Sequence, residues 1–144
     1  MNRSPKGVGE VSEAQVIARM LLAGEVVLQP FGDNQRYDIV LDRDGTFLRV
    51  QIKTGRIRKG AVIFNTCSNG PDHKTTVGYI GDADLFAVYC PENNKVYVSP
   101  VEECGKVLLA MRVEPAKNRQ DARYRSATDY EYPMATTQPV KGLV

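Results

Sequence analysis

Residues Tyr37–Leu41 (YDIVL), Asp42–Gly45 (DRDG) and Thr46–Lys53 (TFLRVQIK) predict two β-strands joined by a tight turn. Alternation along the second strand separates an apolar face from a largely polar one, namely Leu48, Val50 and Ile52 against Phe47, Arg49, Gln51 and Lys53. A turn of either two or four residues places Asp38 on the same side as Gln51 and Lys53. We therefore expect one face of this hairpin in the core and an acid, an amide and a lysine together on the other.

The size of the chain limits how many cores it can form. With 144 residues, 42% of them hydrophobic and 25% charged, it can bury one sizeable core but is short for two. We expect a single domain at residues 7–132 and a disordered tail at 133–144, which lacks periodicity. Because no apolar run approaches the roughly 18 residues that span a bilayer and the N-terminus is polar, we expect a cytoplasmic protein without membrane attachment.

The basic residues are unevenly distributed. A net charge of +2 is too small to indicate a polyanionic partner by itself, but no acidic residue occurs between Gly45 and Pro71. Two basic clusters stand out, one containing Arg49, Lys53, Arg56, Arg58 and Lys59 and the other Lys117, Arg119, Arg123 and Arg125. Either cluster alone could be a solvated surface. Beside a candidate metal site, the first favours contact with phosphates.

A helix is predicted from Ser12 to Ala23, with Gly24 ending it. Ser12 followed by Gln15 resembles a capping box, although residues 7–11 could form an earlier helical turn. An apolar stripe at helical spacing consists of Val16, Ile17, Met20 and Leu21. Glu13 lies at the N-terminal end of this stripe, so we expect its carboxylate to point inward.

The rest of the chain reads as short strands separated by turns. The predicted elements are strands Glu25–Phe31, Ala61–Asn65, Asp84–Cys90 and Lys95–Ser99, a long loop Ser68–Gly81, and a short helix that starts at Pro100–Glu103. Three cysteines without CxxC spacing indicate neither a disulfide framework nor a zinc site.

The polar face of the hairpin carries groups suited to phosphodiester hydrolysis, which requires charge neutralisation on the phosphate and an oriented water. The Asp38 carboxylate, the Gln51 amide oxygen and the Ile52 carbonyl could hold Mg²⁺, for which Mn²⁺ can substitute. Lys53 could position or deprotonate the attacking water, and Glu13 could add a carboxylate if its helix packs across this face. Alternatively, these residues are only the solvated face of an amphipathic hairpin.

These residues resemble a known family. Glu13, Tyr37-Asp38 and Gln51-Ile52-Lys53 together resemble the PD-(D/E)XK nuclease superfamily. Longer segments are similar to a bacterial subgroup that includes homing endonucleases encoded in cyanobacterial group I introns, namely Gly32–Asp38, Arg49–Arg56 and Asp84–Pro91. The resemblance extends over about residues 7 to 131.

The resemblance implies an α/β restriction endonuclease-like core with a mixed β-sheet flanked by helices. It also implies Mg²⁺-dependent hydrolysis of double-stranded DNA and assembly into a homodimer or homotetramer. Carried over by position, Asp38 is the central metal ligand, Gln51 replaces the usual second acid, Lys53 is the motif lysine and Glu13 the helix carboxylate. Tyr37 stands where the family motif has proline, and Gln51 removes one negative charge from the site.

Residues outside this constellation would bind the DNA, mostly through phosphates. The candidates are Gln35, Arg36, Arg49, Arg56, Arg58, Lys59, Lys117, Arg119, Arg123 and Arg125. Gln35 and Arg36 could equally be turn residues. Sequence does not choose between a homing or restriction-like enzyme and a Holliday-junction-type resolvase, and Gln51 leaves open a catalytically inactive DNA-binding protein on a nuclease fold.

Overall fold

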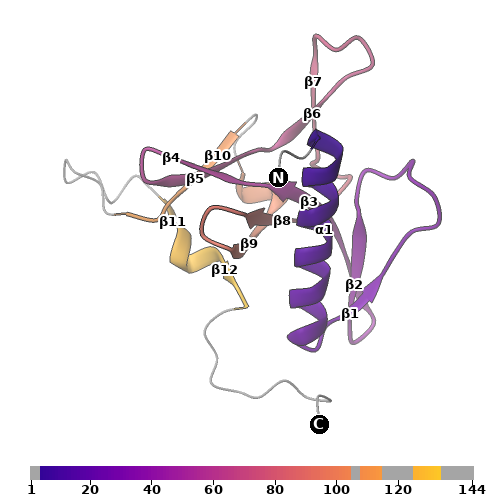
Figure 1. Ribbon diagram of the computed structural model, residues 1–144. Coiled ribbons are helices and arrows are strands. Elements are labelled where there is room, and N and C mark those ends of the chain that lie inside the picture. Colours follow the sequence, from indigo (N-terminus) through magenta and orange to yellow (C-terminus); the bar gives the residue numbers. More distant parts are fainter. Residues whose placement is uncertain (1–3, 105–107, 115–124, 134–144) are drawn as a thin grey trace.

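The structure is a computed structural model that describes residues 4–104, 108–114 and 125–133. Its elements are α1 (Pro5–Leu22), β1 (Val26–Leu28), β2 (Ile39–Arg43), β3 (Thr46–Thr54), β4 (Arg56–Arg58), β5 (Ala61–Asn65), β6 (Cys67–Asn69), β7 (Thr76–Gly78), β8 (Leu85–Cys90), β9 (Lys95–Pro100), η1 (Val101–Glu103), β10 (Leu108–Arg112), β11 (Arg125–Ser126), η3 (Ala127–Tyr130) and β12 (Glu131–Tyr132). Figure 1 shows α1 running alongside the strands. Most of the tail predicted at 133–144 lies outside the described residues, and the limits of the predicted domain stay a prediction.

The strands form three sheets. A six-stranded sheet has the order β1-β2-β3-β8-β9-β12, a four-stranded sheet the order β11-β10-β5-β4, and β6 pairs with β7 alone. Within the six-stranded sheet β3 and β8 run parallel, whereas the other neighbouring pairs are antiparallel. The predicted mixed sheet is thus confirmed.

The predicted hairpin forms with the expected alternation. Arg43 pairs with Thr46, so the connection is the two-residue turn Asp44-Gly45, and Ile39 pairs with Val50. Both turn residues have positive φ, 53° and 87°, as the type of turn that suits a twisted hairpin requires. The apolar face, including Val50, is buried as predicted.

Helix α1 begins earlier than the capping-box prediction placed it. Ser4 is the N-cap, its Oγ accepts a hydrogen bond from the Gly7 N–H at 3.2 Å, and Pro5 occupies the first turn. Ser12 is instead buried within the helix, where its Oγ lies 2.5 Å from the Thr54 Oγ1. The start at Ser12 was therefore wrong, and the earlier turn over residues 7–11 is real.

One face of the six-stranded sheet packs against α1. Val16 and Met20 are fully buried there against the apolar side of the hairpin, whereas Leu21, which we placed on the same stripe, is 54% exposed. The buried line runs through Ser12, Val16 and Met20 at a spacing of four residues, and Leu21, directly after Met20, is turned about 100° away from it.

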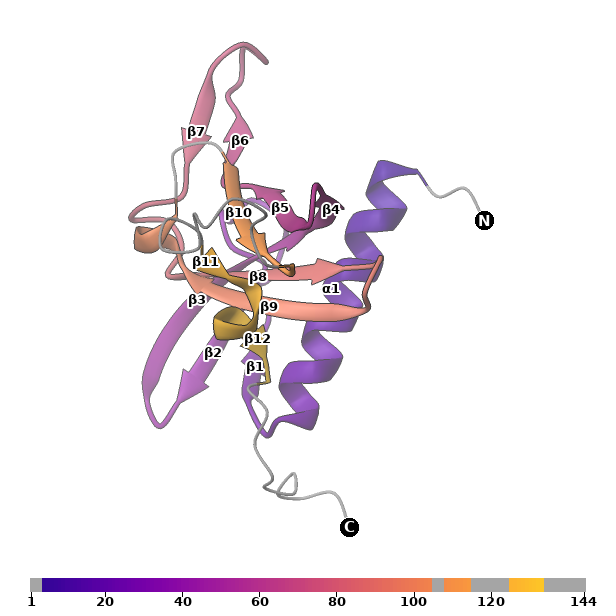
Figure 2. The same cartoon turned by 90° about the vertical axis from the view of Figure 1, so that its left-hand side faces the viewer.

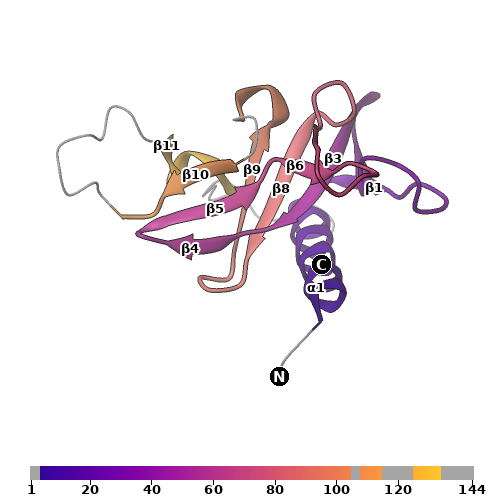
Figure 3. The ribbon, with the colours of Figure 1, turned by 90° about the horizontal axis from the view of Figure 1, so that it is seen from above.

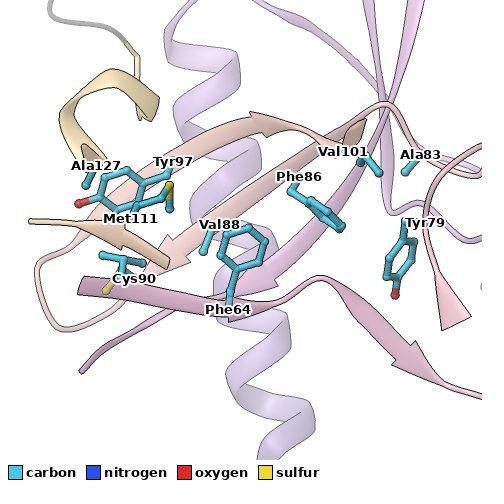
Figure 4. Close-up of a cluster of buried hydrophobic side chains, with 11 residues drawn as sticks. Phe64, Tyr79, Ala83, Phe86, Val88, Cys90, Tyr97, Val101, Met111 and Ala127 are labelled. Atoms are coloured by element: carbon cyan, nitrogen blue, oxygen red, sulfur yellow. The ribbon is translucent and has the colours of Figure 1, made fainter. Parts of the chain in front are cut away.

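The other face of the six-stranded sheet packs against the four-stranded sheet, on the side away from α1 (Figure 3). Phe64 of β5 and Met111 of β10 belong to one buried cluster with Phe86 and Val88 of β8 in this layer (Figure 4). The prediction of several flanking helices was wrong, since α1 is the one α-helix in the described ranges. The short helix expected at Pro100–Glu103 is only the 3-10 turn η1, which ends at Glu103 with Cys104 as its C-cap.

Two further predictions needed correction. The first strand covers Val26–Leu28 rather than Glu25–Phe31, because Pro30 has no N–H to donate and Gly32 turns the chain with φ 88°. The predicted loop Ser68–Gly81 contains the β6–β7 hairpin, which projects from the other sheets (Figure 2).

In the described part of the chain no helix has the length and apolar character needed to span a membrane.

Candidate active site

Asp38 lies one residue before β2 and is attached to β3 at two points. Its N–H donates to the Val50 carbonyl at 2.9 Å, and its Oδ2 accepts a hydrogen bond from the Ile52 N–H at 2.7 Å. Burial raises the pKa of the Asp38 carboxyl, and the Ile52 N–H and the positive charge of Lys53 oppose that rise. The carboxylate is therefore held beside the middle of β3, within electrostatic range of Lys53.

Gln51 and Lys53 share the face of β3 that is turned away from α1. They pair with Phe86 and Val88 of β8, whose side chains belong to the layer between the two larger sheets. The Gln51 Nε2 lies 3.4 Å from the Ile52 carbonyl oxygen. The Gln51 amide thus lies beside the Ile52 carbonyl, with its NH2 group turned towards that carbonyl oxygen.

Lys53 is half-buried, and its ammonium is surrounded by polar and aromatic groups. Its Nζ donates to the Tyr79 hydroxyl at 3.2 Å and to the Cys67 carbonyl at 3.4 Å. The same Nζ lies 4.6 Å from the centroid of the Tyr79 ring. The lysine is therefore oriented by residues at the base of the β6–β7 hairpin.

Glu13 reaches the site from α1. The helix packs on the apolar face of the sheet and not across the face of Gln51 and Lys53, but the Ser12–Thr54 contact brings its N-terminal half to the end of β3. Burial raises the pKa of the Glu13 carboxyl, and repulsion from Asp38 and then Glu10 raises it further. The carboxylates of Glu13 and Asp38 are close enough to destabilise each other's charge.

This donor set fits a divalent cation of the magnesium type. Two half-buried carboxylates that repel each other are stabilised by a cation between them. Ile52, whose N–H is bonded to Asp38, and its neighbour Gln51 carry a carbonyl and an amide that could supply further oxygen ligands. No cluster of three or more His, Cys, Asp or Glu side chains suited to a metal occurs in the ranges that the structure describes. A site with few protein ligands is typical for Mg²⁺, which keeps several of its waters.

Two of the arginines predicted to bind DNA make intramolecular contacts. Arg36 donates to Asp82 Oδ2, Ser68 Oγ and the carbonyls of Val77 and Gly78 at 2.6 to 3.3 Å. Its guanidinium carbon also lies 4.3 Å from the centroid of the Tyr79 ring. These contacts attach the base of the β6–β7 hairpin to the segment before β2.

Arg49 has a comparable set of partners. Its guanidinium donates to both carboxylate oxygens of Asp84 at 3.2 Å and to the Gly81 carbonyl at 2.8 Å. The side chain is therefore engaged in joining β3 to the segment that leads into β8.

The remaining candidate DNA contacts are distributed as follows. Gln35, Arg56, Arg58 and Lys59 are exposed, Arg125 is half-buried, and Lys117, Arg119 and Arg123 lie outside the described residues. Arg58 also lies 3.7 Å from Glu92. Arg56 and Lys59 flank it near the β4–β5 turn, so this end of the four-stranded sheet carries exposed positive charge.

Sequence reasoning missed Tyr79, Asp82 and Asp84. Tyr79 lay in a predicted loop without periodicity, so nothing marked it as a neighbour of Lys53. For the two aspartates a signal existed in the sequence. The segment between Gly45 and Pro71 has basic residues and no acidic one, so acids that pair with those basic residues must come from elsewhere in the chain. Asp82 and Asp84 are the first acids after the short turn at Asp72.

Comparison with known proteins agrees with this geometry. A protein-family model described as PD-(D/E)XK endonuclease matches residues 3–133. Among solved structures, the bacterial homing endonuclease I-Ssp6803I is similar, with 26% sequence identity, a TM-score of 0.71, and 90% of this chain and 89% of that chain covered. Curated proteins yield no significant match. The chain belongs to the PD-(D/E)XK endonuclease family, as the resemblance of its motif residues predicted.

Proposed function

We propose that this protein is a metal-dependent endonuclease that hydrolyses phosphodiester bonds of double-stranded DNA, in the manner of homing or restriction enzymes. The observation that carries the proposal is the position of Asp38, hydrogen-bonded to the Ile52 N–H and within electrostatic range of both Lys53 and Glu13. Family membership and the likeness to a homing endonuclease support the same reaction class.

The Asp38 carboxylate, the Gln51 amide oxygen and the Ile52 carbonyl would hold Mg²⁺ or Mn²⁺. When bound, the metal neutralises charge on the phosphate and lowers the pKa of a coordinated water. The Ile52 N–H fixes one oxygen of Asp38, which leaves the other oxygen to face the metal. Because Gln51 is neutral, this site would have one negative charge fewer than a site with the second acid of the family motif.

Lys53 and Glu13 would act on the attacking water and the phosphate. The Lys53 ammonium can donate hydrogen bonds to a water or to a phosphate oxygen, which orients one towards the other. Glu13 adds an acceptor that can orient a water on the side of Asp38 facing the helix. Both side chains are only half-buried, so nucleic acid can approach them.

A catalytically inactive DNA-binding protein is the second candidate function. Gln51 favours it, because an amide in place of an acid leaves the predicted metal site with one negative charge fewer. The retention of Asp38 and Lys53 favours the enzyme. In either case the exposed Arg56 and Lys59 would contact phosphates, and assembly of the chain into a homodimer or homotetramer would allow both strands to be engaged.

A plasmid-nicking assay with Mg²⁺ or Mn²⁺ tests the proposal. Asp38→Ala and Lys53→Ala should each abolish cutting while DNA binding, measured by gel shift, survives. The exposed variants Asp129→Ala and Lys95→Ala serve as matched controls and should cut like the wild type. Equal cutting by the wild type and both active-site variants would show a contaminating nuclease and overturn the assignment.

A further inference from the structure

The environment of Lys53 assigns a role to Tyr79. Among the described residues, both acceptors within hydrogen-bond distance of the Lys53 Nζ belong to the base of the β6–β7 hairpin, the Tyr79 hydroxyl and the Cys67 carbonyl. The ammonium also faces the Tyr79 ring at 4.6 Å. One tyrosine thus contacts the lysine through both its hydroxyl and its π-system.

Tyr79 is itself held firmly. Only 5% of the residue is exposed, and its ring meets Phe86 edge-on at a centroid distance of 5.5 Å and an angle of 85°. Figure 4 shows it at one end of the buried cluster. Arg36 stacks on the same ring and is fixed by Asp82 and by the strands of the hairpin. The hydroxyl therefore occupies a defined position relative to β8.

Such support matters for a lysine in particular. Its side chain has several rotatable bonds, so a free lysine loses much conformational entropy when it is ordered. A cation–π contact and a hydrogen bond to a charged group both oppose that loss. The two contacts with Tyr79 therefore favour one position of the ammonium before DNA binds.

We propose that Tyr79 is a positioning residue that holds the Lys53 ammonium beside Asp38, and that Arg36 acts in the same way by fixing the Tyr79 ring. The inference rests on the function proposed above, in which Lys53 orients the reacting groups. A lysine displaced by about 1 Å would lower the rate of cleavage by up to about 100-fold without weakening the binding of DNA. Tyr79 therefore affects the rate of the chemical step and not the affinity for DNA.

Tyr79→Phe removes only the hydroxyl and keeps the ring contacts with Phe86, Arg36 and Lys53. Under single-turnover conditions we expect its cleavage rate to fall about 10-fold or more while the Kd for DNA stays within about two-fold. Tyr97→Phe is the matched control, because Tyr97 is equally buried in the same cluster but lies at its other end, with its hydroxyl bonded to Asn93 (Figure 4). This control should cleave at the wild-type rate.

A second measurement reports the contact without cleavage. In protein labelled with ¹³C at the lysine ε-carbon, the Lys53 ε-protons should be shifted upfield by the Tyr79 ring, with Lys95 as the unshifted reference and Lys53→Arg as the assignment control. Tyr79→Leu should remove that shift. A wild-type protein that cuts no DNA contradicts the proposed function, whereas this NMR measurement still decides whether Tyr79 holds Lys53. An unshifted Lys53 in the wild type, or wild-type cleavage by Tyr79→Phe, would overturn the inference.

Discussion

Asp84 is bonded to Arg49 through both the main chain and the side chain. Its Oδ2 accepts a hydrogen bond from the Arg49 N–H at 2.7 Å and another from the Arg49 Nε at 3.2 Å. Asp84 directly precedes β8, its N–H donates to the Arg49 carbonyl at 2.8 Å, and its own carbonyl accepts from the Val101 N–H at the start of η1 at 2.9 Å. This pair therefore fixes the relative positions of the two parallel central strands that carry the candidate site.

The Asp84–Arg49 pair should make stability depend on pH. The side chain of Arg49 holds the pKa of Asp84 below its ordinary value of 3.8. Because the folded-state pKa is the lower one, the stabilisation is complete above the unfolded-state pKa and is lost as pH falls through the folded-state pKa. In thermal melts from pH 7 to pH 2, Asp84→Asn should be less stable at pH 7 and lose less Tm on acidification. Asp33→Asn, at an exposed turn, should follow the wild-type slope.

Arg36 should contribute more to stability than to DNA binding. Arg36→Lys loses the forked contacts with Ser68, Asp82 and two carbonyls, so we expect a destabilisation of about 1 to 3 kcal/mol in urea unfolding. Arg56→Lys, at an exposed position, should stay within about 0.5 kcal/mol of the wild type. Equal stability of the two variants would show that the Arg36 contacts are not maintained in solution.

Gly55 should tolerate no side chain, for reasons of space. It separates β3 from β4, and a Cβ there would lie 2.9 Å from a methyl group of Val62 and from one of Val88, both buried. Gly55→Ala should destabilise the protein by about 1 to 3 kcal/mol. Gly9→Ala, in α1 where a Cβ meets nothing within 4 Å, should be neutral or stabilising by up to about 1 kcal/mol. Chemical denaturation of both variants measures the difference.

Gln51→Glu should restore the usual charge of the metal site. A third carboxylate near Glu13 and Asp38 increases repulsion in the absence of metal, so Tm without Mg²⁺ should fall and should recover when Mg²⁺ is added. The Mg²⁺ concentration that gives half-maximal cleavage should also fall, with cleavage kept or increased. Unchanged metal dependence in both measurements would place Gln51 outside the ligand set.

Tyr132 should make the protein sensitive to alkali. Burial raises the pKa of its hydroxyl to about 12, and the buried hydroxyl has no hydrogen-bond partner among the described residues. Because the folded-state pKa is raised, stability is full below pH 10 and decreases as pH rises towards 12. Tyr132→Phe should be as stable as the wild type at pH 7 or slightly more so, and should lose less stability between pH 9 and pH 11. A parallel loss in both proteins would contradict this.

Local pattern alone was sufficient for the central hairpin. Asp44-Gly45 suits a two-residue turn and the residues on either side alternate, so register and face follow from chain geometry. The same alternation placed Gln51 and Lys53 together. Local pattern failed for the helix start. Ser12 satisfies a capping pattern, but its hydroxyl contacts Thr54, which is distant in sequence. The strand predicted at Ala61–Asn65 is confirmed as β5 in the layer over β8, whereas the several flanking helices that the resemblance implied are not found among the described residues.

By itself, then, the sequence determined the strand pair that carries Asp38, Gln51 and Lys53, and it indicated the family. Only the tertiary structure decided that Glu13 approaches Asp38 from α1, that Arg36 is bonded within the protein, and that Tyr79 contacts Lys53. The physical reason is the range of the interactions. Side-chain alternation depends on neighbouring residues, whereas the contacts of Arg36 and Tyr79 join segments tens of residues apart and form only when those segments pack together in the folded chain.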